Sequence, residues 1–277
     1  MRIFVTGAGG YIGRHVVTSL LDKGAEVYVN DFKMDHIDNR AKRIDIDIFK
    51  DDDVYNKAYK PDVCLHMAWK DGFVHNSHSH IGLLSNHYNF INNMFKDGLK
   101  HLAVMGSMHE VGYHEGAISE DTPCNPISNY GIAKDTLRRS NQLLAKEYNS
   151  TWQWIRAYYI SGDDKYSGSI FRKIIEAVEM GKKVFPFTSG KNKYDFIDIK
   201  DLANMISETV MQDEVNGIIN CCSGKPVSLS EYVERFIKEK GFDIKLEYGA
   251  FPDRDYDSPS VWGDNAKIKK IMTKNNM

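Results

Sequence analysis

The sequence lacks the features that mark membrane-bound, secreted and nucleic-acid-binding proteins. Its 277 residues carry a formal net charge of -2 with Lys and Arg scattered along the chain, so no electrostatic site for nucleic acid or an anionic membrane is expected. No apolar run approaches the ~20 residues of a membrane-spanning helix, and no signal-peptide pattern is visible. The four cysteines (Cys64, Cys124, Cys221 and Cys222) match neither a disulfide framework nor a zinc-ligand spacing. We therefore expect a cytoplasmic protein with reduced thiols.

A metal site is not expected either. His75, His78 and His80 are closely spaced, but nothing next to them completes a set of metal ligands. This segment is better explained as a loop that leads into the polar start of a helix.

A glycine-rich turn near the start of the chain is the strongest single motif. An apolar run at residues 3–5 leads directly into Thr-Gly-Ala-Gly-Gly-Tyr-Ile-Gly at residues 6–13, and a helical pattern follows. Strand, turn and helix form the first half of a βαβ unit. In such a unit Gly7 closes the turn, Gly10 lets backbone approach a pyrophosphate, and Gly13 lets the helix pack on the strand. The predicted cofactor contacts in this turn are Gly7, Gly10, Tyr11, Ile12 and Gly13.

An acid follows this turn at the spacing that a dinucleotide site requires. Residues 27–31 read as a second strand, and Asp31 ends it roughly 20 residues after the glycines. Asp31 is expected to accept hydrogen bonds from the adenosine ribose and to repel a 2'-phosphate, which favours NAD over NADP. Lys33, Arg40 and Arg43 lie nearby in the sequence and keep NADP possible.

The rest of the chain continues to alternate strands and helices. Further buried strands are predicted at residues 43–48, 63–68 and 101–105, with a helix at 81–96. Asp47, at the end of its strand, is placed to meet the adenine amino group. The predicted cofactor contacts on these strands are Asp47, Ile48, Met67 and Ala68. Ligands bind at the carboxyl edge of such sheets, and residues 107–110 follow the strand at 101–105 at that edge.

A tyrosine and a lysine are predicted to form the catalytic pair. Tyr130 and Lys134 lie four residues apart near the start of a predicted helix from Ser128 to Tyr148, so both point to one side. An ammonium near a phenol favours the phenolate, so we expect the pKa of Tyr130 to fall from about 10 toward the working range of a general acid or base. A sixth strand is predicted at residues 152–159.

Together these motifs resemble the extended short-chain dehydrogenase/reductase family of nucleotide-sugar epimerases, dehydratases and reductases. The matching segments are the glycine turn at 6–13, His-x-Ala at 66–68, Asn86, Pro-x-Ser-x-Tyr-Gly-x-x-Lys at 126–134, Asp-Phe-x-x-x-x-Asp at 195–201 and Asn-x-x-x-Gly at 220–224. The resemblance implies an α/β fold: a Rossmann doubly wound parallel sheet with a smaller α/β C-terminal lobe that binds substrate. We expect the Rossmann domain at residues 1–165, with 188–221 returning to it, and the lobe at 166–187 and 222–277.

The chain departs from the family pattern at several substrate-facing positions. Met108 stands where the family has a Ser or Thr that bonds the reacting oxygen, and a thioether cannot donate that bond. Ser107 or His109 is expected to replace it. The predicted substrate contacts are Met108, Glu110, Tyr159, Arg172, Tyr194 and Arg254. For His109 and Glu110, a purely structural role beyond the strand remains an equal alternative.

The segment at residues 106–113 looks like the branch that reduces nucleotide-linked (dTDP- or GDP-) 4-keto-6-deoxy sugars. The resemblance implies that Tyr130 gives a proton to the C4 oxygen, that Lys134 lowers its pKa and bonds the nicotinamide ribose, and that Ser107 or His109 orients the ketone. It also implies a homodimer formed through the helices that carry Asn86 and Tyr130. Two alternatives stay open: an epimerase or 4,6-dehydratase that recycles bound NAD, and a cofactor-binding regulatory protein without catalysis.

Overall fold

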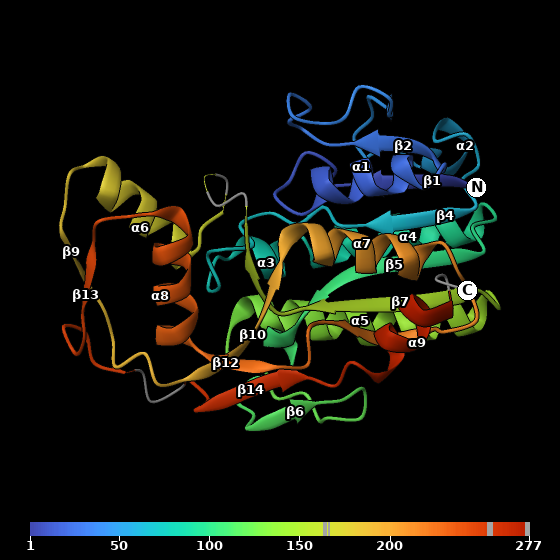
Figure 1. Ribbon diagram of the computed structural model, residues 1–277. Helices are drawn as coiled ribbons and strands as arrows, with labels where there is room; N and C mark the ends of the chain where they lie inside the picture. Colours follow the sequence, from blue (N-terminus) through green and yellow to red (C-terminus); the bar gives the residue numbers. More distant parts are fainter. Residues whose placement is uncertain (163–164, 166, 254–256, 275–277) are drawn as a thin grey trace.

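A seven-stranded parallel sheet forms the larger part of the molecule (Figure 1). The computed structural model describes residues 1–162, 165, 167–253 and 257–274. The strand order is β11-β7-β5-β4-β1-β2-β3, which reverses direction at β1 and defines a doubly wound sheet. Its strands are β1 (Arg2–Thr6), β2 (Glu26–Asn30), β3 (Lys42–Arg43), β4 (Val63–His66), β5 (His101–Ser107), β7 (Thr151–Ala157) and β11 (Gly217–Cys221).

Helices cover both faces of this sheet, and consecutive residues of β1 face opposite layers. Ile3 and Val5 pack under one group of helices, whereas Phe4 packs under the other. The first group is α1 (Gly13–Asp22), α7 (Ile199–Val210) and α9 (Ala266–Lys274). The second group is α2 (Val54–Lys57), α4 (Leu84–Lys96) and α5 (Asn129–Glu147), with the short α3 (Ser79–Gly82) before α4. Alternation along a strand that is buried on both sides explains why its sequence is a continuous apolar run.

A second, smaller sheet and two helices form the other part of the molecule. The strand order is β12-β10-β14-β6, with β8 paired to β10. Its strands are β6 (Gly116–Ile118), β8 (Tyr159–Ser161), β10 (Lys193–Asp198), β12 (Pro226–Ser228) and β14 (Ser260–Gly263). Figure 1 shows α6 (Ile170–Glu179), α8 (Leu229–Lys240), β9 (Val184–Pro186) and β13 (Lys245–Glu247) grouped at one end of the molecule. Their apolar side chains share a third core with this sheet.

Several predicted boundaries differ from the structure. Lys42 and Arg43 form β3 and pair with β2, so Arg43 is the one residue of the predicted strand at 43–48 that lies in the sheet. The chain leaves the sheet after Arg43. Ile44 and Ile48 are still buried, while the Asn30 side chain donates to the Ile44 and Ile46 carbonyls at 2.9 Å and replaces ladder bonds. The apolar pattern therefore predicted burial correctly and the strand incorrectly.

One predicted helix and one predicted strand each form two elements in the structure, and the last helix packs in a different part of the molecule than predicted. The predicted helix at 81–96 is two helices, because α3 ends at Gly82 and α4 begins at Leu84. The predicted strand at 152–159 divides into β7, in the large sheet, and β8, which joins the second sheet through β10. Helix α9 packs on α7 and β11 through Ile268 and Ile271, although we assigned residues 222–277 to the smaller lobe. Within the described residues, no helix has the length and apolarity needed to cross a bilayer.

Candidate active site

The glycine turn after β1 has the geometry of a phosphate-binding turn. Gly7 has φ 71°, and a Cβ there would lie 2.5 Å from the Ala68 nitrogen, so only glycine fits. Gly10 is exposed, and a Cβ there would meet only the Gly7 oxygen, at 3.2 Å, which leaves its outer side open to a ligand. Helix α1 begins at Gly13 with no acidic residue in its first turn, so the positive end of its dipole favours an anion. These residues fit the pyrophosphate of a dinucleotide.

Two other predicted cofactor contacts in this turn, Ile12 and Tyr11, also have structural roles. Ile12 is the N-cap of α1 and packs against the core. The Tyr11 hydroxyl donates to the Gly162 carbonyl, which ties the turn to the segment after β8.

Asp31 lies directly after β2 and is bonded to the glycine turn. Its carboxylate accepts from the Gly9 N–H at 2.9 Å and from the Lys33 N–H at 3.1 Å. Gly9 itself has no room for a side chain, since a Cβ would lie 1.8 Å from the Lys33 oxygen. The contact between Asp31 and Gly9 was not predicted, although the extra glycine between Gly7 and Gly10 was its signal in the sequence.

The remaining predicted cofactor contacts fall into two groups. Met67 and Ala68 follow β4 beside the glycine turn, where the Ala68 N–H donates to the Thr6 hydroxyl at 3.3 Å. Asp47 lies on a loop, accepts from the Phe49 N–H at 3.1 Å and pairs with Lys50, which lowers its pKa. Ile48 is buried. The first group lines the carboxyl edge of the sheet, and the Asp47 side chain is half-exposed beside Lys50.

Tyr130 and Lys134 lie in the first turns of α5, as the spacing predicted. The Ser128 side chain caps the helix by accepting from the Gly131 N–H at 3.2 Å. The Lys134 ammonium donates to the Met105 carbonyl of β5 at 2.7 Å and lies 5.9 Å from the centre of the Tyr130 ring. The pair is therefore anchored to the carboxyl end of β5.

The expected fall in the pKa of Tyr130 does not occur in this structure. Burial raises the pKa of Tyr130 to about 12, and a hydrogen bond with the Ser107 side chain lowers it only in part. Burial also lowers the pKa of Lys134 to about 7, while the charge of Glu110 raises it. Removal from water therefore outweighs the attraction between ammonium and phenolate. The phenol is held as a proton donor.

Ser107 is the polar group that the structure brings to Tyr130. It ends β5 and caps a short 3-10 turn, η1 (Met108–Glu110), by accepting from the His109 N–H at 3.3 Å. The His109 ring centre lies 6.2 Å from that of Tyr130 and 4.4 Å from that of His75. Burial and the neighbouring His75 lower the pKa of His109 to about 4, so this imidazole is neutral near pH 7. Met108 is buried.

Glu110 does not face a substrate, contrary to our prediction. It is 0 % exposed, and its carboxylate accepts from the Ser107 N–H at 2.6 Å, Trp154 Nε1 at 2.7 Å and Arg156 Nε at 3.2 Å. The structural alternative therefore holds for Glu110, which fixes the backbone of Ser107. An arginine inside the buried strand β7 was the sequence signal for such a partner.

Aromatic rings that the sequence analysis did not assign surround Tyr130. The His75 ring stacks on the Tyr130 ring at 5.4 Å and 11°, and the His75 carbonyl accepts from the Tyr130 N–H at 2.9 Å. His80 and Trp69 present edges to it at 5.3 and 6.1 Å. Among the described residues, no group of His, Cys, Asp and Glu has a metal-binding arrangement.

Three of the other predicted substrate residues lie on elements of the smaller part of the molecule. Tyr159 and Tyr194 pack together in the second sheet with ring centres 4.3 Å apart. Arg172 is on α6, where its guanidinium bonds Glu176 at 2.7 Å. Arg254 lies outside the described residues.

A dinucleotide-type turn on a doubly wound sheet, with a half-buried tyrosine and a buried lysine paired at the same edge, defines a nucleotide-dependent oxidoreductase fold. The chain belongs to the NAD dependent epimerase/dehydratase family, whose model matches residues 3–222.

Individual relatives agree with this assignment. The chain is 44% identical over 271 residues to a dTDP-6-deoxy-L-talose 4-dehydrogenase (NAD(+)) of Aggregatibacter actinomycetemcomitans, which covers 95% of this chain and 99% of that protein. It has the fold of MoeE5 solved with UDP-glucuronic acid and NAD (TM-score 0.83, 21% identity, 99% and 93% of the two chains). The NAD complex of the UDP-glucose 4-epimerase of Thermus thermophilus has a TM-score of 0.80 at 19% identity, covering 99% and 93%.

Proposed function

We propose that this protein is an NAD(P)-dependent oxidoreductase that interconverts a ketone and an alcohol at C4 of a dTDP-linked 6-deoxy sugar. The observation that supports this most strongly is the near full-length 44% identity to a dTDP-6-deoxy-L-talose 4-dehydrogenase. The buried group of Ser107, Tyr130 and Lys134 supplies the chemistry. We expect NAD to be preferred over NADP, because the Asp31 carboxylate lies beside the glycine turn, where it would repel a 2'-phosphate.

Reduction of the C4 ketone adds one hydride to carbon and one proton to oxygen. The bound nicotinamide cofactor supplies the hydride. The Tyr130 hydroxyl donates its proton to O4 as the C4–H bond forms, and in the reverse direction the phenolate takes that proton back. The Ser107 hydroxyl orients the oxygen, and the Lys134 ammonium stabilises the phenolate that remains.

A coupled absorbance assay tests this function. Purified protein, NADH or NADPH and a dTDP-4-keto-6-deoxy sugar should show loss of absorbance at 340 nm in step with alcohol formation. Tyr130→Phe should lower kcat by about 10²- to 10⁴-fold because the proton donor is gone. Tyr55→Phe, a half-buried tyrosine on α2, is the matched control and should leave kcat unchanged. Conversion of a sugar without net loss of NADH would refute the proposal and favour an epimerase or dehydratase.

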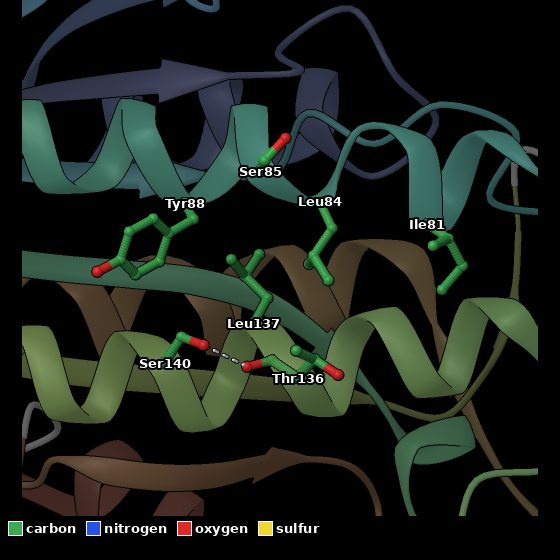
Figure 2. Close-up of a pocket in the computed structure, with 7 residues that line it drawn as sticks. All are labelled: Ile81, Leu84, Ser85, Tyr88, Thr136, Leu137 and Ser140. Carbon is green, nitrogen blue, oxygen red and sulfur yellow. Dashed lines mark hydrogen bonds between the residues drawn. The ribbon is translucent and has the colours of Figure 1, made fainter.

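The surface formed by α4 and α5 supports a homodimer. A groove with a volume of about 410 Å³ lies between α5 and the helices α3 and α4, and Figure 2 shows the residues that line it: Ile81, Leu84, Ser85, Tyr88, Thr136, Leu137 and Ser140. Two apolar side chains are exposed along the same helix α5: Ile132 at 42% and Leu143 at 70%. A second copy of this chain would cover such a face with like helices.

The mass of the protein in solution tests the dimer. Light scattering should give twice the mass of one chain, and Leu143→Glu should shift it toward one chain because a buried charge opposes association. Met180→Glu changes an equally exposed apolar side chain elsewhere, 72% exposed, and should leave the mass unchanged. A single-chain mass for the unmodified protein would refute the dimer.

We also propose a cytoplasmic location. All four cysteines are free thiols in the structure, as expected of a reducing compartment.

A further inference from the structure

The Lys134 ammonium lies over the face of an indole. Its nitrogen is 3.7 Å from the centre of the Trp69 ring, well inside the roughly 6 Å limit for a cation–π contact. Trp69 follows Ala68 at the carboxyl edge of the sheet, so the indole reaches the lysine from the strand beside β5. One lysine N–H donates to the Met105 carbonyl, and the indole lies against another side of the ammonium.

Two histidines hold the indole in this place. Trp69 Nε1 donates to His80 Nδ1 at 3.0 Å, so the proton of His80 is on Nε2, which lies 2.9 Å from the Val74 carbonyl and donates to it. The indole also stacks on the His87 ring, with centres 4.5 Å apart and planes 18° apart. Position and tilt of the indole are thus both constrained.

His87 is in turn connected to the first strand. Its Nδ1 lies 2.8 Å from His66 Nε2, and His66 Nδ1 lies 2.7 Å from the Thr6 hydroxyl. This buried chain runs from β1 through β4 and α4 to the underside of Trp69. A path of direct contacts therefore connects the glycine turn, which follows Thr6, to the lysine.

The titratable groups near Lys134 belong to several of the elements that pack around it. Glu110 of η1 raises the pKa of Lys134, and Tyr130 of its own helix is neutral. Burial lowers the pKa of His66 well below its usual range and that of His87 to about 3, so both are neutral at pH 7. His80 of α3 is held by the indole and by Val74. Burial opposes the lysine charge here, and the π face of Trp69 favours it.

We propose that Trp69 is a positioning residue for Lys134: its indole face holds the ammonium charged and in place beside Tyr130. The catalytic meaning of this contact rests on the proposed function, in which a charged Lys134 stabilises the phenolate. The contact itself concerns the protein alone. It can therefore be tested without turnover.

The direct test measures the titration of Lys134 in the full chain. Lysine labelled with carbon-13 at Cε reports each ammonium by NMR, and the signal of Lys134 is the one lost in Lys134→Met. The titration is repeated in Trp69→Phe, which keeps a weaker π face, and in Trp69→Leu, which has none. Trp262→Leu removes another half-buried tryptophan, on β14 in the second sheet, and is the matched control.

The pKa of Lys134 should fall by about one unit in Trp69→Leu and by less in Trp69→Phe, since a desolvated cation–π contact has about that strength. It should not change in Trp262→Leu. An unchanged or higher pKa of Lys134 in both Trp69 variants would overturn the proposal. Trp69→Phe decides the question should Trp69→Leu fail to fold.

Activity gives a second readout that separates this proposal from the proposed function. The alkaline limb of the kcat profile should move to lower pH in Trp69→Leu by the same amount as the NMR titration. If wild-type protein converts no dTDP-sugar, the proposed function fails, while the NMR titration still decides the role of Trp69. An active enzyme with an unmoved alkaline limb in Trp69→Leu would exclude the positioning role.

Discussion

The carboxylate of Glu110 lies in the protein interior and is surrounded by donors from three segments. Arg156 is also 0 % exposed, so each of the two charges depends on the other. Arg138 adds a third charge, with Nε 3.7 Å from the same carboxylate oxygen. Such a pair adds little stability over apolar packing, but the loss of one member leaves a buried charge without compensation.

Glu110→Gln should therefore lower the free energy of unfolding by about 3 kcal/mol. It should also lower kcat, because an amide oxygen is a weaker acceptor than a carboxylate for the Ser107 N–H. Urea unfolding and steady-state kinetics measure the two effects. Glu115→Gln, at an exposed position, should change neither by much. Equal stability of the two variants would contradict the buried-pair explanation.

We propose that Asp31 determines a different property, the choice between NAD and NADP. Its charge lies where the ribose 2'-position is expected, and Asn keeps an oxygen that can accept from the Gly9 N–H. Asp31→Asn should raise kcat/KM for NADPH relative to NADH at least about tenfold, because repulsion of the 2'-phosphate is removed. Asp35→Asn removes the same charge from an exposed position in the same loop and should leave the ratio unchanged. A ratio unaltered by Asp31→Asn would exclude this role.

At the scale of elements, α5 carries both members of the proposed catalytic pair within its first turns, so we expect its N-terminus to have a functional as well as a structural role. Ser128 accepts from Gly131 at 3.2 Å, and Ser228 makes the same cap on α8, accepting from Glu231 at 3.2 Å. The two helices thus begin alike, but α8 carries neither Tyr130 nor Lys134.

Ser128→Ala and Ser228→Ala should each lower the free energy of unfolding by about 1 kcal/mol, the usual effect of losing an N-cap. Only Ser128→Ala should also lower kcat, because the first turn of α5 positions Tyr130. Thermal unfolding and the 340 nm assay give both quantities. A fall in kcat of the same size in Ser228→Ala would mean that general stability, and not the position of Tyr130, controls the rate.

At the scale of the whole molecule, several histidines are buried in neutral form. Burial lowers the pKa of His87 to about 3 and of His109 to about 4, and that of His66 falls well below its usual range. The unfolded chain, whose histidines titrate near pH 6.5, therefore takes up protons first as the pH falls. The free energy of unfolding therefore has its full contribution from these neutral histidines above about pH 6.5, and this contribution is lost progressively toward pH 3 to 4.

Stability should fall by about 1 kcal/mol for each of these histidines between pH 6.5 and 5.5, or roughly 3 kcal/mol for the three, and at up to about 1.4 kcal/mol per pH unit for each below that range. Urea unfolding at a series of pH values measures this slope. His87→Asn should reduce the slope by about one third, because one of the three buried imidazoles is then absent. A flat stability between pH 6.5 and 5.5 would show that these imidazoles are not neutral in the folded protein.

Local patterns predicted the glycine turn, the strand before it, and α5 with its cap at Ser128, because each depends on contacts between residues close in sequence. The Tyr130 and Lys134 pair is of the same kind, since a helix places positions four apart on one side. The lobe boundaries and the strand at 43–48 were not predictable in this way. Whether Ile44 lies in a strand or in a loop depends on the hydrogen bond that the Asn30 side chain, 14 residues earlier, donates to its carbonyl.

The sequence by itself determined the class of this protein, because the spacing of glycines, acid, tyrosine and lysine encodes the local geometry that a dinucleotide and a proton donor require. Only the tertiary structure decided the charge states of the site. Burial outweighs the lysine charge at Tyr130, and Glu110 turns inward to Arg156. Trp69 reaches Lys134 from the segment after β4, 65 residues earlier in the chain (positions 69 and 134). Desolvation and packing depend on all neighbours in space, and no spacing along the chain reports them.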